Sequence, residues 1–143
     1  MQNFFKTLKS KNIACGYLYF YIHFITEIAC FYFLSVVTNN SNFIWLVPLI
    51  YDGLAFVPQS LFGYINDKHP KIILSTYGTI FMIIAYILNF CTKINLFTSL
   101  MILCIGNAFM HINGAETTLK ASEGKLSHSA IFVSGGSFGV ITG

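Results

Sequence analysis

Residues 13–37 read IACGYLYFYIHFITEIACFYFLSVV, an almost unbroken run of apolar and aromatic side chains. A helix needs about 20 consecutive, mostly apolar residues to cross the hydrocarbon core of a bilayer, and this run is long enough. It is too long for the apolar region of a cleaved signal peptide, and no A-x-A cleavage site follows it. The run therefore predicts an uncleaved first membrane-spanning helix.

Three more apolar windows follow, at residues 44–65, 72–90 and 94–112, and a shorter apolar run occupies residues 129–143. The last run holds about 15 residues, too few to cross a bilayer comfortably. The composition agrees, because only 9% of the residues are charged, against about 25% in a soluble domain. We predict an all-α, polytopic transmembrane bundle with four complete spans and part of a fifth.

The lysines set the predicted orientation, because cytoplasmic loops of membrane proteins are enriched in Lys and Arg. Only Lys93 lies in a loop on the opposite side from the others. This distribution places the amino terminus in the cytoplasm, in the plasma or inner membrane. The lysines are dispersed, so the net charge of +3 does not indicate nucleic-acid binding. The lysines on the cytoplasmic side are Lys6, Lys9, Lys11, Lys68, Lys71, Lys120 and Lys125.

Three ionisable side chains lie near the middle of the first two spans. His23 and Glu27 are four residues apart and share one helix face, and Asp52 lies in the second span. An ionisable group at this depth costs several kcal/mol unless it faces a partner or a water-filled cavity. Histidine changes its charge near neutral pH, and apolar surroundings favour the protonated form of a carboxylate. We predict that these residues bind a proton or another cation.

Three further polar residues extend these faces. Gln59 lies two helical turns from Asp52 on nearly the same face, and Asn107 and His111 share a face of the fourth span. Three helices thus each present one polar stripe, and the economical arrangement points all three at one water-filled cavity. This predicts that the three residues line a substrate path. The alternative is that all of these polar residues form structural pairs, for example Glu27 with His23, which hold helices together by hydrogen bonds worth about 1 kcal/mol each.

No pattern typical of an enzyme or of a metal site occurs in the sequence. It contains neither a Walker lysine in a glycine-rich loop nor a G-x-S-x-G nucleophile elbow. The four histidines lack the spacing and the third ligand that a zinc site needs. The four cysteines form no C-x-x-C pair and are expected to act as small apolar residues. We expect no enzymatic activity, no metal and no cofactor.

The loop after the second span reads GYINDKHPK from Gly63 to Lys71. A carboxylate here can cap a neighbouring helix or pair with a base from another segment, and a simple charged turn is the alternative. The loop resembles the G-x-x-x-D-[RK]-x-G-[RK] signature of the major facilitator superfamily of secondary transporters. Gly63, Asp67 and Lys68 match, Lys71 takes the last basic place, and Pro70 stands where that family has glycine.

Other stretches are similar to uncharacterised bacterial members of that superfamily near the drug-efflux and fosmidomycin-resistance type. They read HFITE at 23–27, YDGLAF at 51–56 and GNAFMH at 106–111. The resemblance implies about twelve helices in two halves, with a small solute bound near the membrane midplane. It further implies a secondary transporter, with proton-coupled efflux as one form, and a cytoplasmic latch formed by the loop.

Under that resemblance the chain is the amino-terminal portion of a transporter, and its partners are the bilayer, a small-molecule substrate and the remaining helices. The alternative is a small non-transporting membrane protein that serves as an interaction or assembly subunit. A reading frame that continues past Gly143 favours the first reading, and a stop codon there favours the second.

Glycines recur every four residues in the last apolar run, at Gly135, Gly139 and Gly143. Small residues at this spacing form one smooth stripe that another helix can approach closely. We predict close helix packing there. The polar stretch 113–127 is expected to form a cytoplasmic connection that includes a short surface helix.

Overall fold

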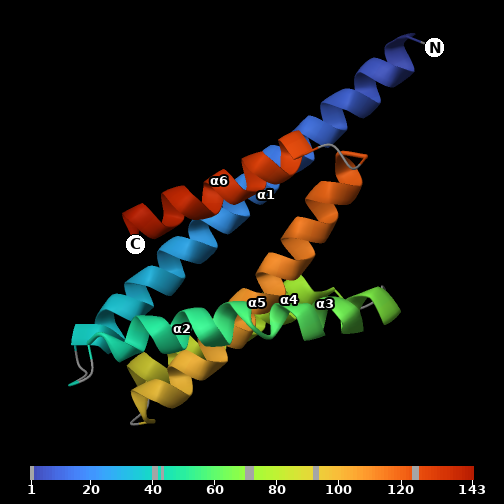
Figure 1. The fold of residues 1–143 in the computed structure, drawn as a ribbon. Coiled ribbons are helices and arrows are strands. Elements are labelled where there is room, and N and C mark those ends of the chain that lie inside the picture. Colours follow the sequence, from blue (N-terminus) through green and yellow to red (C-terminus); the bar gives the residue numbers. More distant parts are fainter. Residues whose placement is uncertain (1, 40–41, 43, 70–72, 92–93, 124–125) are drawn as a thin grey trace. The chain divides into compact units, whose positions relative to one another are not determined.

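The computed structural model describes residues 2–39, 42, 44–69, 73–91, 94–123 and 126–143. The part of the chain that it describes contains helices and no strand, so the predicted all-α fold is confirmed (Figure 1). In chain order the helices are α1 (Gln2–Asn39), α2 (Leu46–Phe56), α3 (Gln59–Lys68), α4 (Leu74–Cys91), α5 (Leu96–Ala121) and α6 (Leu126–Thr142).

Four segments are long and apolar enough to cross a membrane, and they correspond to the four predicted spans. They are Ile13–Asn39, Leu46–Lys68, Leu74–Cys91 and Leu96–Ala121. The chain is therefore a membrane protein built from helices. The short final run forms α6, which begins three residues earlier than predicted.

The polar stretch after the fourth span does not form a separate connection, because α5 continues through it to Ala121. One local interaction favours the extension, because Lys120 pairs with Glu116 one turn earlier. The Thr118 hydroxyl is satisfied within the helix, where it donates to the Gly114 carbonyl at 2.8 Å. The helix ends where Glu123 takes a φ of 55°, the left-handed conformation that commonly terminates helices.

The second span is broken into α2 and α3 at Pro58. Proline has no N–H and its ring clashes with the preceding turn, so it interrupts the ladder of backbone hydrogen bonds. The Gln59 side chain compensates, because its Nε2 donates to the Ala55 carbonyl at 3.0 Å. Pro48 lies in the first turn of α2, where a missing N–H is tolerated. Of the two prolines in this span, only Pro58 interrupts the helix.

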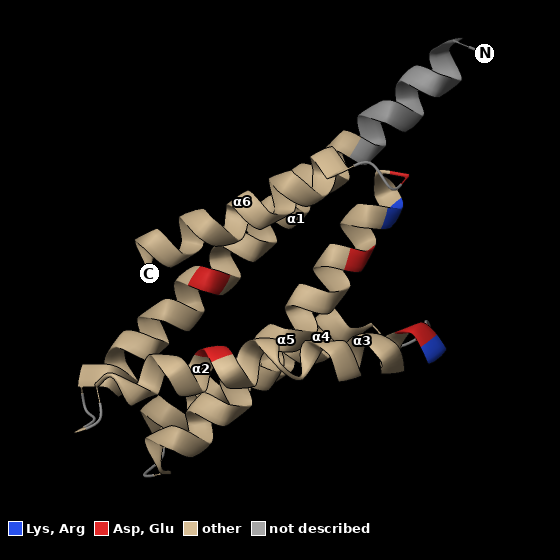
Figure 2. Ribbon diagram, viewed as in Figure 1, with Lys and Arg blue, Asp and Glu red and all other residues tan. Residues whose placement is uncertain are grey.

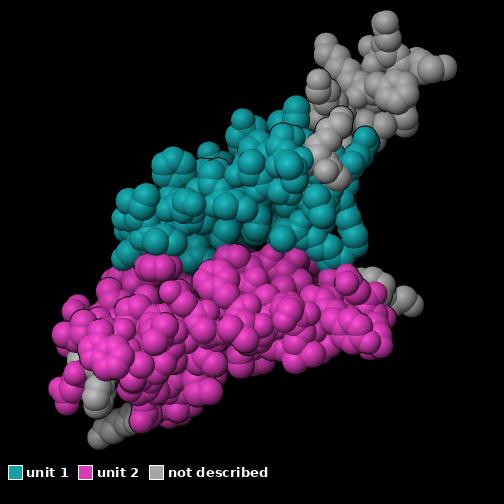
Figure 3. Space-filling view, in the orientation of Figure 1, with its two compact units in different colours: residues 1–28, 114–143 teal, residues 29–113 magenta. Residues whose placement is uncertain are grey.

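The chain divides into two compact units, Met1–Ile28 with Gly114–Gly143 and Ala29–Asn113, which are coloured separately in Figure 3. We call them unit 1 and unit 2. The divisions fall inside α1 and α5, and each unit is described by itself.

In unit 1, α6 runs alongside α1 in the same direction. Gly16 of α1 lies against the imidazole of His128 at the start of α6, and Ile28 lies against Gly143 at its end. The residue numbers of the contacting residues increase together along both helices, so α1 and α6 are parallel (Figure 1).

The predicted glycine stripe faces α1 in this pair. A Cβ added at Gly139 would lie 2.6 Å from the Phe24 carbonyl oxygen, and one at Gly143 would lie 2.6 Å from that of Ile28. A Cβ at Gly135 would collide with the Phe20 carbonyl. The three glycines therefore allow backbone-to-backbone contact over three successive turns of α1.

Unit 2 encloses the main apolar core, to which α1, α2, α4 and α5 contribute. Here α4 and α5 cross at two glycines. A Cβ on Gly78 would lie 2.7 Å from the Gly106 carbonyl oxygen, and a Cβ on Gly106 would lie 2.8 Å from that of Gly78. Gly78 also contacts Met110, and Gly106 contacts Met82, so the two helices are antiparallel.

The helix directions within the units agree with alternating membrane crossings. In unit 2, Tyr51 contacts Asn107 and Phe56 contacts His111 further along both helices, so α2 runs parallel to α5. Alternation makes the second and fourth spans parallel, the third and fourth antiparallel, and the first parallel to α6. All three relations are observed, provided that α2 and α3 count as one span.

Candidate functional site

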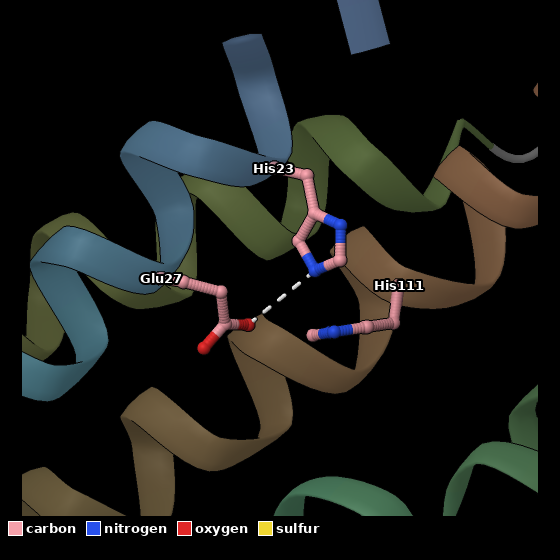
Figure 4. A group of neighbouring side chains, drawn as sticks. All are labelled: His23, Glu27 and His111. Atoms are coloured by element: carbon pink, nitrogen blue, oxygen red, sulfur yellow. Dashed lines mark ion pairs between the residues drawn. The ribbon is translucent and has the colours of Figure 1, made fainter. Parts of the chain in front are cut away.

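A buried histidine–glutamate pair occupies the middle of the first span. His23 Nε2 lies 3.6 Å from Glu27 Oε1, one helical turn along α1 (Figure 4). The side chains are 8% and 5% exposed, so the pair is removed from the surface of the protein. The sequence predicted that these two residues share a face, and the structure confirms that their side chains face each other, at a distance slightly beyond that of a hydrogen bond. His111, which Figure 4 also labels, belongs to unit 2.

The other ring nitrogen of His23 bonds to α6. Nδ1 lies 2.8 Å from the Phe132 carbonyl oxygen, and the imidazole stacks on the Phe132 ring with centroids 4.3 Å apart. A Cβ at Gly136 would collide with the imidazole. The absence of a side chain at Gly136 thus leaves room for the ring to reach a carbonyl one turn earlier in α6.

Phe132 and Gly136 were not among the predicted site residues. Gly136 follows Gly135 directly and does not belong to the four-residue glycine repeat. This extra glycine was the only feature of the sequence that could have pointed to Gly136. Phe132 takes part through its backbone carbonyl and its ring, and no sequence pattern identifies a carbonyl that a distant side chain will use.

Lysine, aspartate and glutamate residues are sparse along the described helices (Figure 2). Of the described acids, Glu116 and Glu123 lie near the end of α5 and Asp67 lies at the end of α3. Glu27 and Asp52 lie inside segments long enough to span a membrane, and Asp67 and Glu116 lie in such segments nearer to an end.

Asp52 and Gln59 differ in environment. Asp52 is exposed on α2, in the span with the smallest buried share of the four, 17%. Gln59 is half-buried, and its amide nitrogen is used at the helix break. The hydrogen bond gives Gln59 a structural role at Pro58, and its predicted place on a substrate path stays a prediction.

Asn107 and His111 lie on one face of α5, as predicted. Asn107 is fully buried and donates from Nδ2 to the Tyr51 hydroxyl at 2.6 Å. His111 is half-buried, with Nδ1 3.1 Å from the Asn107 carbonyl oxygen and its ring edge-on to Phe56. Tyr51, buried and unpredicted, thus joins α2 to the polar face of α5.

The predicted latch lies at the end of α3. Asp67 and Lys68 are exposed, and the Lys68 ammonium lies 4.5 Å from the centre of the Tyr64 ring, within range of a cation–π interaction. A Cβ at Gly63 would meet no atom within 4 Å. Lys71 lies outside the described residues.

In comparisons with known proteins, no family model, no curated protein and no solved structure matches the chain. The site must therefore be interpreted from its own residues.

Proposed function

We propose that this chain belongs to a proton-coupled secondary transporter of the major facilitator type, which moves a small solute across the plasma or inner membrane. The observation that carries the proposal is the buried His23–Glu27 pair in the first span. Keeping two ionisable groups at this depth has a cost of several kcal/mol. A protein retains such groups where they serve a proton or ion pathway more often than for stability.

A structural role explains part of the arrangement, because the hydrogen bond from His23 to the Phe132 carbonyl links α1 to α6. It does not explain the attraction between His23 and Glu27, since both residues lie on α1. The same helix would be more stable in a bilayer with two apolar residues at these positions. A role in binding and releasing one proton would explain why both residues are present.

Asp52 supports the same proposal from a different helix. Its exposed carboxylate lies inside a membrane-spanning segment, where contact with lipid tails is unfavourable. It therefore faces water, a solute or another protein segment in the membrane. Asn107 and His111 supply polar groups on α5 for a solute path, and Gly63, Asp67 and Lys68 form the proposed cytoplasmic latch.

The orientation is part of the proposal. The lysine distribution supports a cytoplasmic amino terminus, and the helix directions in each unit agree with alternating crossings. The bilayer, the solute and the remaining helices of such a transporter are the proposed partners. Neither enzymatic activity nor nucleic-acid binding is part of this role.

The alternative, a small assembly subunit, relied on the glycine stripe as a surface for partners. Gly135, Gly139 and Gly143 are instead packed against α1 of the same unit. The stripe is already occupied, so it supplies no argument for a partner protein.

The test is proton movement in vesicles that contain the full-length protein and a trapped pH-sensitive dye. A panel of cationic, neutral and anionic amphiphilic solutes is added in turn. We expect at least one solute to move protons, and we expect Glu27→Gln to abolish the signal. Glu123→Gln, which changes a carboxylate in the turn after α5, is the matched control. If Glu27→Gln and Asp52→Asn both leave proton movement intact, the assignment of these carboxylates is wrong.

A further inference from the structure

The hydrogen bond between α1 and α6 constrains the chemistry of His23. A carbonyl oxygen can only accept a hydrogen bond, so the contact of 2.8 Å with Phe132 requires a hydrogen on Nδ1. In neutral imidazole only one nitrogen carries a hydrogen. Neutral His23 is therefore the Nδ1–H tautomer, and its Nε2 carries a lone pair.

That lone pair faces Glu27. With His23 neutral and Glu27 ionised, two acceptor atoms lie 3.6 Å apart with no hydrogen between them. One added proton removes this repulsion, either as imidazolium beside carboxylate or as neutral imidazole beside carboxylic acid. The added proton belongs to the pair rather than to one residue, and in both forms Nδ1 keeps its hydrogen.

Gly136 makes this geometry possible. The imidazole fills the space that a side chain at Gly136 would occupy, which brings Nδ1 to the carbonyl of Phe132 on the preceding turn. Gly139 plays the corresponding part for Glu27, because a Cβ there would lie 2.6 Å from Glu27 Cβ. Two glycines of α6 thus accommodate the two members of the pair.

We propose that the Phe132 carbonyl and the gap at Gly136 hold His23 as the Nδ1–H tautomer, so that Nε2, shared with Glu27, is the atom that gains and loses the coupling proton. This inference rests on the proposed transport function and adds Phe132 and Gly136 as positioning residues. The proton moves between water and the pair, and no bond between heavy atoms changes.

Other ionisable side chains could also change the proton movement and the NMR titration, so their contributions need separate controls. In unit 1, α6 contributes Phe132, Gly136 and Gly139 to the surroundings of the pair, and its His128 lies against Gly16. The end of α5 in this unit holds Glu116 and Lys120, which pair with each other. Unit 2 carries Asp52 and His111 in its spans, so Asp52→Asn and His111→Gln are run as separate controls.

The experiment is ¹⁵N NMR of the full-length protein in lipid bilayers, with histidine labelled on both ring nitrogens. The His23 signals are assigned by their loss in His23→Gln. We expect Nδ1 to stay protonated across the titration while only Nε2 changes. An Nε2–H tautomer with a bare Nδ1 in the neutral form would overturn the proposal.

A second measurement tests the role of Gly136. We expect Gly136→Ala to displace the ring and to restore a mixture of tautomers, whereas Gly53→Ala, where a Cβ meets nothing within 4 Å, leaves the spectrum unchanged. An unchanged tautomer in folded Gly136→Ala would contradict the positioning role. His23→Gln keeps a donor for the Phe132 carbonyl but exchanges no proton, so we expect it to retain folding and lose proton movement.

The two proposals fail differently. A bare Nδ1 in a protein that still moves protons would refute the tautomer assignment and leave the transport function standing. The predicted tautomer in a protein that moves no proton with any solute would refute transport and leave the geometry standing.

Discussion

Asn107 on α5 and Tyr51 on α2 are joined by a hydrogen bond of 2.6 Å between the Asn107 amide nitrogen and the Tyr51 hydroxyl oxygen. Both side chains are buried, so neither can exchange its partner for water. The bond fixes the position of α2 along its parallel neighbour α5 in unit 2.

Replacing Tyr51 with Phe should destabilise the protein. The substitution leaves the Asn107 amide without its acceptor in a buried place, which costs about 1–3 kcal/mol. Chemical unfolding of the protein in mixed micelles measures the change. The double variant Tyr51→Phe with Asn107→Leu should recover part of the loss, because both polar partners are then gone. A neutral single variant, or strictly additive effects, would argue against the bond.

The glycine crossing of α4 and α5 should tolerate no side chain. Gly78→Ala places a methyl group 2.7 Å from the Gly106 carbonyl oxygen, and the helices must separate to accept it. We expect a loss of about 1–3 kcal/mol, the usual cost of overpacking. Gly63→Ala is the matched control, since its Cβ meets nothing within 4 Å. Equal stability of the two variants would contradict the close crossing.

The sequence predicted the spans well, because lipid imposes a simple requirement for length and apolarity on each crossing. Local spacing also predicted that His23 and Glu27 share a face, as do Asn107 and His111, since helix periodicity alone decides which residues are neighbours on one helix. The prediction failed after residue 112, where polarity suggested a connection, whereas α5 continues to Ala121 with an ion pair one turn apart in its last turns.

Contacts between helices were less accessible to sequence reasoning. The glycine stripe indicated that a helix approaches α6, but its partner α1 lies more than a hundred residues earlier in the chain. Tyr51, Phe132 and Gly136 were missed because tyrosine, phenylalanine and glycine are ordinary in apolar helices, and their importance depends on which helix they face. The predicted cavity shared by three polar stripes stays a prediction.

The contribution of Gln59 to stability should depend on the helix break at Pro58. We expect Gln59→Leu to cost about 1 kcal/mol, the typical value of one hydrogen bond, because the Ala55 carbonyl loses its donor. In the background Pro58→Ala, a regular helix supplies a backbone donor and the same substitution should have little effect. The test compares the unfolding free energies of the parent protein, Gln59→Leu, Pro58→Ala and the double variant. An equal cost in both backgrounds would assign Gln59 a different role.

Cys91 offers a test of orientation. It is exposed at the end of α4, on the side predicted to be external. With Cys15, Cys30 and Cys104 replaced by Ala, a membrane-impermeant maleimide added to intact cells should label Cys91. In the matched protein with Cys91→Ala and His69→Cys, labelling should require broken cells. The reverse pattern would place the amino terminus outside.

The most direct test of proton coupling compares two activities in the same vesicles, using a solute that moves protons in the parent protein. If Glu27 carries the coupling proton, Glu27→Gln should still exchange labelled solute across the membrane while solute-driven proton movement falls to the level of protein-free vesicles. Undiminished proton movement in Glu27→Gln, with Glu123→Gln as the reference, would contradict the account.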